Sequence, residues 1–431
     1  MAPRSFLSED QVRAVQREFG TPVFVYDQRT LEAQAKRVLG FPNAYGLTAR
    51  YAMKALPTSA IIRLLHDLGL HVDASSGYEA ERALRAGVPP EHIRVTAQEL
   101  PRNLDELLEQ GVLVTACSLH QLGVLGGLRP GREITVRINP GLGSGHSNRT
   151  NVGGPSASFG IWHEHLEEVL EIQREHDLHV TGIHTHIGSG VDPAVWTHCA
   201  QLSLGIVARL PEVTTLGLGG GFNVGRMPGE QSADLDVIGR SIQARFEAFH
   251  EAHGRKLRLE IEPGTYLVAN AGALVCIVID VVNTGAEGYD FIKVDSGMTE
   301  IVRPAMYGAQ HPLTIVPAVR GPADREGEAP SEPPDRPTKP YLVAGHCCES
   351  GDVLTPAPGN PEGLRARLLT EPRVGDAVVV GGAGAYCAAM SSKNYNSFPE
   401  APEVLLEADG SFRLIRARQT IDQMVANEVE F

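Results

Sequence analysis

Residues 49–54, Ala-Arg-Tyr-Ala-Met-Lys, form the first of eight short runs that decide the fold of this chain. Each run is rich in apolar or β-branched residues, which is typical of a buried strand. The predicted strands are residues 49–54, 71–76, 92–98, 113–118, 133–139, 180–187, 214–221 and 257–263. Amphipathic helical patterns separate them, at residues 58–68, 77–86, 104–109, 164–176 and 233–253. This alternation predicts a parallel sheet, and eight units close a (β/α)8 TIM-like barrel. An open doubly wound sheet is the alternative.

The pattern changes after residue 270, where strand-like runs follow one another with few helical patterns. These runs are residues 273–283, 291–295, 314–319, 341–344, 377–380, 403–407 and 411–416. They predict a second, mostly antiparallel β domain. The early run 22–26 is assigned to that domain, so the barrel comprises residues 27–270 and the β domain residues 1–26 plus 271–431. Residues 321–340, rich in Pro, Glu, Asp and Arg, predict a solvated loop.

Composition excludes several classes of partner. The net charge of −14 argues against binding a phosphate backbone, and no cluster of basic and aromatic residues is present. No run approaches the length that spans a bilayer, and the first residues lack the apolar segment of a secretory signal. The six cysteines form no C-x-x-C pair, which indicates reduced thiols rather than disulfides or structural zinc. We therefore expect a cytoplasmic protein that binds neither nucleic acid nor membrane.

Groups suited to chemistry stand at the ends of the predicted barrel strands, where such barrels carry their active sites. Lys54 ends the first strand. An amine partly removed from water loses its proton more readily and can form a Schiff base with a carbonyl, whereas a surface lysine is the alternative. The other strand-end groups are Asp73, Ser76, Arg137, Asn139, His184, His186, Ser189, Gly219, Gly220, Gly221 and Glu262.

The glycine run 219–221 follows a strand, so its backbone N–H groups can approach a phosphate closely. It is not a dinucleotide fingerprint, because Phe222 occupies the last glycine position and no acidic ribose partner follows at the proper distance. A tight turn between strand and helix is the alternative interpretation. Ser189 would add a hydroxyl donor to the same phosphate.

His184 and His186 are two residues apart and share one strand face. No third ligand has suitable spacing, which disfavours a metal site. We expect His186 to stack on a flat cofactor ring and His184 to be a core histidine. Glu262, facing a pyridine nitrogen, would keep that nitrogen protonated and make the ring an electron sink.

Several segments together resemble the fold-type III pyridoxal-phosphate (PLP) decarboxylases, the class II ornithine/lysine/arginine decarboxylase family, and within it most closely the diaminopimelate decarboxylases. These segments are residues 51–55, 71–79, 184–190, 219–222, 262–264, 303–309, 348–352, 384–386 and 390–396, and they span nearly the whole chain in the family's order. The resemblance implies an alanine racemase-like fold, PLP as cofactor and decarboxylation of an amino acid. The closest likeness implies conversion of meso-2,6-diaminopimelate to L-lysine.

The resemblance also implies roles for single residues. Lys54 is the Schiff-base lysine, His186 stacks on the pyridoxal ring and Glu262 pairs with the pyridinium nitrogen. The phosphate is held by Ser189, the glycine run 219–221 and Tyr386, and Asp73 and Arg137 are further candidates for binding the cofactor.

On the substrate side, the resemblance implies that Arg303, Tyr307, Glu349 and Tyr386 meet the substrate. Arg303 would bind a distal carboxylate, Glu349 a distal ammonium, and Tyr307 would add a hydroxyl. Cys348 and Glu349 are similar to a pair that a partner subunit lends to the active site, with Cys348 as the proton donor. A homodimer with shared active sites follows.

Two features depart from the family pattern. Thr265 replaces the arginine that normally follows Glu-Pro-Gly, which removes a strong contact to a carboxylate or phosphate. The segment 141–155 is richer in glycine than the usual lid, and its Arg149 is a candidate for the missing charge. Decarboxylation of another basic amino acid, such as D-ornithine, D-lysine or carboxynorspermidine, therefore stays open. Glu262 and Cys348 argue against an alanine racemase, and the second domain argues against a non-enzymatic PLP carrier.

Overall fold

The computed structural model describes residues 5–143, 153–186, 188–318 and 336–429. The chain divides into two compact units. The barrel unit comprises Leu31–Val224 and Gln231–Leu267, and the β unit comprises Met1–Thr30, Gly225–Glu230 and Val268–Phe431. The short segment Gly225–Glu230 thus belongs to the β unit although it interrupts the barrel part of the chain. The domain boundaries predicted above, 27–270 and 1–26 plus 271–431, remain our proposal.

The barrel unit contains a closed parallel barrel, which confirms the predicted fold and shows that the open-sheet alternative is wrong. In the described residues the strands follow the order β5-β4-β3-β2-β10-β9-β8-β6, and β5 also pairs with β6, which closes the ring. Their bounds are β2 Leu47–Ala52, β3 His71–Ala74, β4 Ile93–Thr96, β5 Leu113–Ala116, β6 Glu133–Asn139, β8 His179–His184, β9 Thr215–Gly217 and β10 Arg258–Ile261. A short strand that was not predicted, β7 (Ile161–Trp162), pairs with β6.

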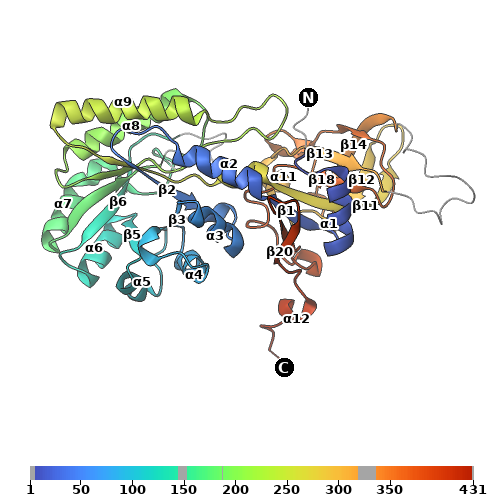
Figure 1. The fold of residues 1–431 in the computed structure, drawn as a ribbon, viewed down its shortest axis with the longest axis horizontal. Helices are drawn as coiled ribbons and strands as arrows, with labels where there is room; N and C mark the ends of the chain where they lie inside the picture. The colour runs from blue at the N-terminus through green and yellow to red at the C-terminus, as the bar shows by residue number, and fades with distance from the viewer. Residues whose placement is uncertain (1–4, 144–152, 187, 319–335, 430–431) are drawn as a thin grey trace, which may run out of the picture. The chain divides into compact units, whose positions relative to one another are not determined.

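Helices surround the barrel strands (Figure 1). They are α2 Gln28–Leu39, α3 Ser59–Asp67, α4 Gly77–Arg85, α5 Leu104–Gln110, α6 Leu119–Leu128, α7 Leu166–Glu175, α8 Pro193–Ala208 and α9 Leu235–His253. Among the predicted strands that end early, β3 and β5 do so because Ser76 and Ser118 cap the following helices by accepting backbone hydrogen bonds from Glu79 and Gln121. Ser76, a candidate for the site, is therefore a helix cap.

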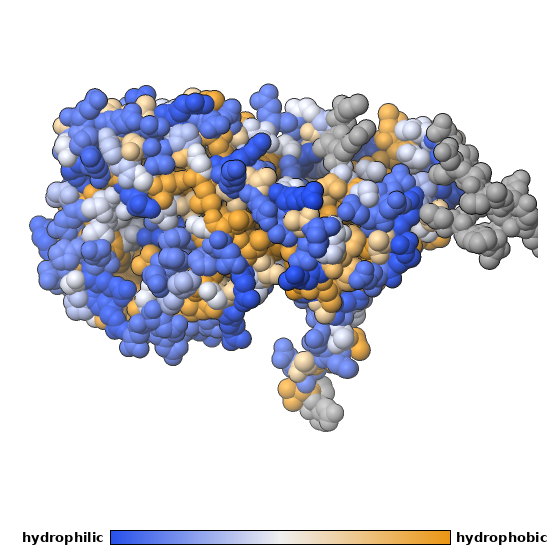
Figure 2. All heavy atoms as spheres, viewed as in Figure 1, coloured by the Kyte–Doolittle hydropathy of each residue, from blue (hydrophilic) through white to orange (hydrophobic). Residues whose placement is uncertain are grey.

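Helix α9 illustrates why these helices stay on the outside. Its buried residues, including Ile238, Ile242, Phe246 and Phe249, recur at the three-to-four-residue spacing of one helix face. The opposite face is polar, and Figure 2 shows the surface over α9 to be largely hydrophilic. The apolar face of α9 packs toward the strands and its polar face contacts solvent, which accounts for its place on the outside of the barrel. No helix among the described residues is long and apolar enough to cross a membrane.

The β unit is built on a mixed, mostly antiparallel sheet. Among the described residues its strands are β1 Val23–Asp27, β11 Gly272–Asn283, β12 Asp290–Val294, β13 Leu313–Val316, β14 Thr338–Ala344, β17 Arg367–Thr370, β18 Ala377–Val380, β19 Glu403–Leu406 and β20 Phe412–Arg416. The pairs β1–β19 and β12–β14 are parallel. Strand β17 and the hairpin of β15 (Pro356–Ala357) and β16 (Asn360–Leu364) were not predicted.

The core of the β unit lies between this sheet and the first helix, α1 (Glu9–Phe19). Val12 and Val15 of α1 are buried against Val25, Val275 and other apolar residues of β1, β11 and β18. Most of the predicted loop 321–340 lies outside the described residues, and its last residues instead begin β14. Two short helices, α11 (Arg303–Tyr307) and α12 (Ile421–Met424), complete the unit.

Candidate active site

Lys54 stands just beyond β2, in a single 3-10 turn of Met53–Ala55. Its neighbours Met53 and Ala55 are buried, so the backbone at this position is held while the lysine side chain stays 45% exposed. The Nζ atom donates to Ser75 Oγ (3.3 Å) and lies 3.9 Å from Asp73 Oδ2. A rigidly mounted amine that solvent can reach suits a nucleophile better than a structural cation.

Glu262 and His184 meet at the same end of the barrel. His184 ends β8, Glu262 follows β10, and the distance between His184 Nε2 and Glu262 Oε2 is 2.9 Å. Burial alone would raise the pKa of Glu262, but the hydrogen bond and charge of His184 hold it well below its ordinary value. Glu262 is therefore a carboxylate. His184, expected to be a core histidine, is buried and positions this acid.

Asp73, on β3, is the second buried carboxyl group at this end. Burial, and then the nearby charge of Glu262, raises its pKa to about 7, while Lys54 opposes this shift. Two carboxyl groups at one end thus differ in protonation, since Glu262 holds its charge and Asp73 takes up a proton readily.

The glycine run packs against the loops that follow β8 and β10. Strand β9 ends at Gly217, so Gly219, Gly220 and Gly221 lie in the loop that follows rather than in the predicted strand. A Cβ on Gly219 would lie 2.5 Å from His186 Nδ1, one on Gly220 2.1 Å from the Glu262 carbonyl oxygen, and one on Gly221 1.9 Å from the carbonyl oxygen of Gly188. Glycine is required at all three positions because the loops meet there.

His186 and Ser189 lie in the loop that follows β8, next to the glycine run. Backbone hydrogen bonds join the loops, from Gly190 N to the Gly221 carbonyl (3.0 Å) and from Glu262 N to the Gly219 carbonyl (2.9 Å). Burial, and then the charge of Arg137, holds the pKa of His186 well below its ordinary value. The His186 ring is therefore neutral, which suits stacking on a flat ring.

Arg137 and Asn139 lie on β6. Arg137 is buried, with its guanidinium 5.1 Å from the centre of the Phe159 ring. Asn139 fastens both ends of the predicted lid, because its Oδ1 accepts from Gly141 N (3.1 Å) and Gly154 N (2.9 Å) and its Nδ2 donates to the Gly154 carbonyl (3.0 Å). Arg149, the candidate for the missing charge, lies outside the described residues.

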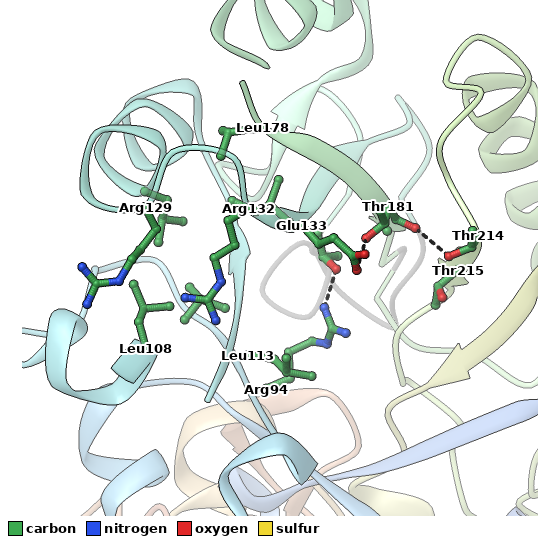
Figure 3. A pocket seen from close by; sticks show the side chains of 15 residues that line it. Arg94, Leu108, Leu113, Arg129, Arg132, Glu133, Leu178, Thr181, Thr214 and Thr215 are labelled. Carbon is green, nitrogen blue, oxygen red and sulfur yellow. Dashed lines mark hydrogen bonds between the residues drawn. The ribbon is translucent and has the colours of Figure 1, made fainter. Parts of the chain in front are cut away.

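The opposite end of the barrel contains a cavity of about 250 Å³. Its lining includes early residues of β4, β5, β6, β8 and β9, among them Arg94, Glu133, Thr181 and Thr215. Figure 3 shows Thr181 donating to Glu133 (3.4 Å) and Thr214 donating to the Thr181 carbonyl (3.4 Å). None of the predicted site residues lines this cavity, so it is separate from the candidate site.

In the β unit, Cys348 and Glu349 are exposed on a loop that Asp352 holds in place. The Asp352 carboxylate accepts from Met298 N (2.7 Å) and Cys347 N (2.9 Å). A Cβ on Gly297 or on Gly345 would lie 2.2 Å from the same carboxylate, so both glycines are needed. The exposed pair is thus presented on a fixed backbone.

A segment with unusual backbone conformation lies beside this pair. Cys348 N donates to Asn396 Oδ1 (2.9 Å), and Asn394, Asn396 and Ser397 all have positive φ angles, between 51° and 61°. Residues other than glycine rarely adopt this conformation, and such positions collect at functional sites. Asn394 and Asn396 fall within residues 390–396, which the sequence singled out, and Ser397 follows directly.

Arg303 opens α11, and Tyr307 closes it. Arg303 Nη1 donates to His311 Nε2 (2.7 Å), and His311 Nδ1 donates to the Gly381 carbonyl (2.9 Å). Tyr386, five residues beyond Gly381, has a φ angle of 56°. One further cation, Arg226, reaches the same turn by donating from Nε to the Gly382 carbonyl (3.0 Å), and the sequence had not indicated it.

Comparison with known proteins gives this arrangement its context. The family described as pyridoxal-dependent decarboxylase, pyridoxal binding domain, matches residues 30–269. The diaminopimelate decarboxylase of Streptomyces coelicolor is 39% identical over 98% of this chain and 93% of its own length. This chain belongs to the pyridoxal-dependent decarboxylases. The decarboxylase is also 37% identical to the diaminopimelate decarboxylase of Escherichia coli K12, over 98% of this chain and 97% of that one. A crystal structure of a diaminopimelate decarboxylase covers 99% of both chains with 36% identity and a TM-score of 0.88.

The cofactor of the decarboxylase is PLP, and the barrel residues fit it. Asp73 Oδ1, His186 Nδ1 and Glu262 Oε1 are buried and have no hydrogen-bond partner among the described residues. Buried polar atoms are normally paired, so these atoms indicate a polar ligand. Glu262 Oε1 in particular is an acceptor on a charged carboxylate, which suits the protonated nitrogen of a pyridine ring.

Proposed function

We propose that this decarboxylase removes carbon dioxide from meso-2,6-diaminopimelate and forms L-lysine. The observation that carries the proposal is the full-length likeness to proteins named diaminopimelate decarboxylase, at 37–39% identity over 98% of this chain. The likeness includes the β unit, where Arg303, Tyr307 and Glu349 supply a cation, a hydroxyl and an anion. A substrate with both a carboxylate and an ammonium group at its far end complements all three.

On the barrel side, Lys54 would hold PLP covalently, and His186 would stack on its ring. Ser189 and the glycine run 219–221, together with Tyr386, would hold the phosphate, and Asp73 and Arg137 would complete the surroundings of the cofactor. When bound, PLP supplies a sink for the electron pair released as the carbon–carbon bond breaks. Glu262 would keep a proton on the pyridine nitrogen, because its carboxylate stays ionised.

On the substrate side, Arg303 would grip the distal carboxylate, Glu349 the distal ammonium, and Tyr307 and Tyr386 would add hydroxyl groups. Gripping the far end fixes the orientation of the bond that breaks. Cys348 would deliver a proton to the carbon atom that has lost carbon dioxide. The exposed position of Cys348 and Glu349 supports their donation by a partner subunit, so we propose a homodimer with shared active sites. A cytoplasmic location is part of the same proposal.

The substrate assignment is tested by comparing kcat/KM for meso-diaminopimelate with kcat/KM for D-ornithine, D-lysine and L-ornithine. We expect meso-diaminopimelate to be preferred by at least about tenfold, because a substrate without the distal carboxylate leaves Arg303 unpaired. The variant Arg303→Ala should narrow this preference. A higher kcat/KM for any of the other amino acids would overturn the substrate while leaving the decarboxylase assignment intact.

The shared site is tested with two inactive variants, Lys54→Ala and Cys348→Ala. After mixing and subunit exchange, a heterodimer would contain one site with both groups intact. We expect activity to return to at most about a quarter of the wild-type value, since half of the dimers would be mixed and each would hold one intact site of two. Exchange of labelled subunits without any return of activity would show that each chain builds its own site.

A further inference from the structure

Arg226 lies on a short, firmly held turn of the β unit. The carboxylate of Glu230 accepts from Arg226 N (2.8 Å) and Met227 N (3.0 Å), and so closes the turn. The turn is also anchored from outside, because Asn270 Nδ2 donates to the Gly225 carbonyl (3.1 Å). The base of the Arg226 side chain is therefore fixed.

The side chain of Arg226 lies against Gly382. A Cβ on Gly382 would be 3.0 Å from both Cγ and Cδ of Arg226, and Gly382 has a φ angle of 63°. Glycine at this position lets the arginine stem pass, and the guanidinium then donates from Nε to the Gly382 carbonyl (3.0 Å). This contact leaves the two terminal nitrogens of the guanidinium for another acceptor.

Arg303 reaches the neighbouring residue of the same turn through His311. Because His311 Nδ1 donates to the Gly381 carbonyl, its Nε2 accepts the hydrogen bond from Arg303. Burial, and then the charges of Arg303 and Arg226, holds the pKa of His311 well below its ordinary value, so the ring is neutral. Two guanidinium groups thus converge on residues 381–382 with neutral partners.

No carboxylate neutralises the two arginines within the part of the chain that the structure describes, since its ion pairs include neither Arg226 nor Arg303. The Glu230 carboxylate, which acts on Arg226 electrostatically, accepts hydrogen bonds from the backbone N–H groups of Arg226 and Met227. Burial, and then the charge of Arg303, lowers the pKa of Arg226 to about 9. Two neighbouring cations without an acid are unfavourable unless an anion binds between them.

We infer that Arg226 and Arg303 together bind one carboxylate, the one that the substrate keeps after decarboxylation. This inference rests on the proposed function and deepens it, because it names a second cation for the distal end of the substrate. The chain has Thr265 where the family pattern has an arginine after Glu-Pro-Gly. Arg226 supplies a second guanidinium beside Arg303 within the β unit, and we assign it as a specificity-determining residue.

The test compares the binding of L-lysine and cadaverine to the PLP-loaded protein by calorimetry. Both ligands carry the same two amines, and only L-lysine has the carboxylate. We expect Arg226→Gln to weaken L-lysine binding by roughly tenfold to a hundredfold, the range for one lost hydrogen bond to a charged group, and to leave cadaverine unchanged. Arg226→Lys, which keeps the charge without the fork, should lose less.

Arg255→Gln is the matched control. Arg255 is also partly buried and also donates to backbone carbonyls, of Leu210 (2.8 Å) and Val213 (2.7 Å), but it lies in the barrel unit. Its variant should not change the ratio of the two affinities. Thermal unfolding of each variant shows whether the protein is folded, so a loss confined to L-lysine cannot come from general destabilisation.

Three outcomes overturn the inference. If Arg226→Gln leaves the L-lysine affinity unchanged, or weakens both ligands equally, Arg226 does not bind the carboxylate. If instead the variant loses affinity for PLP in a titration of the apoprotein, the anion is the cofactor phosphate. If the wild-type protein itself fails to distinguish L-lysine from cadaverine, the proposed function is wrong at the distal end, and that failure is separate from either result for Arg226.

Discussion

Two carboxylates, one on the last strand of the barrel and one just beyond it, have opposite surroundings. Glu260, within β10, lies toward the end of the barrel that holds the cavity, and Glu262 follows the strand at the other end. The Glu260 carboxylate accepts from Arg50 Nη2 (3.1 Å) and lies 3.5 Å from Arg94 Nε. The Glu262 carboxylate uses one oxygen for His184, and its Oε1 has no hydrogen-bond partner in the described residues.

Both pKa values are lowered, but by different partners. Burial would raise the pKa of Glu260, and the charges of Arg94 and Arg50 more than offset it. Arg50 comes from β2, which pairs with β10, and Arg94 comes from β4, so the ion pairs link three strands of the barrel. The pKa of Glu262 is lowered instead by a histidine, and one of its two carboxylate oxygens is buried without a hydrogen-bond partner among the described residues. A paired buried charge indicates a role in stability, whereas a buried acceptor left open indicates a ligand.

The largest effect that follows from this contrast is on turnover in Glu262→Gln. The amide cannot keep a proton on a pyridine nitrogen, so we expect kcat to fall by about 10²–10³-fold, the size of a lost charge contact in an active site. Binding of PLP should persist, because Lys54 and the phosphate loops are untouched. Visible absorbance and kcat measured on one sample separate the two quantities. A near-normal kcat would show that Glu262 does not act on the ring nitrogen.

Glu260→Gln is the control for that variant, with the same change of side chain at the opposite end. It leaves two buried arginines without a carboxylate, and breaking such a group costs about 3–5 kcal/mol. The melting temperature should fall clearly, while kcat of the folded protein stays close to the wild-type value. If Glu260→Gln lost kcat and kept its melting temperature, Glu260 would not have the stabilising role that separates it from Glu262.

The fold was predictable because strand and helix periods are local features of the sequence. Each of the eight barrel strands lies where a run of apolar or β-branched residues predicted it. The errors concern strand ends, since Ser76 and Ser118 belong to helix caps and Gly219 to a packed loop. A serine at the end of a strand-like run, three residues before a residue of a helical pattern, is the signal that would have corrected the first two.

The site was predictable only in part, because contacts between distant segments leave no local pattern. Lys54, Asp73 and Glu262 share one end of the barrel, as strand order requires, and the roles assigned to them remain proposals. The support of Glu262 by His184, 78 residues away in sequence, has no such pattern. No local pattern in the sequence points to Arg226 either. Arg226 belongs to the same unit as Arg303 only because the six-residue segment Gly225–Glu230 is part of the β unit, although the chain before and after it is part of the barrel unit.

The smallest expected effect concerns Asp73, which shares its end of the barrel with Glu262 and titrates in a different range. Its pKa is raised from 3.8 to about 7, so the folded state binds a proton that the unfolded state releases near pH 4. The stability that the neutral form provides is therefore lost as pH rises from about 4 to about 7. Glu262, whose pKa lies well below its ordinary value, adds an opposite slope only below about pH 5.5, where the unfolded carboxyl group still binds a proton, and both proteins share that slope. In the apoprotein, Asp73→Asn should remove this loss, and its melting temperature should gain several degrees on the wild type between pH 4 and pH 7. Equal slopes for the two proteins across that window would mean that Asp73 is ionised throughout, and that the two carboxyl groups at this end do not differ in protonation.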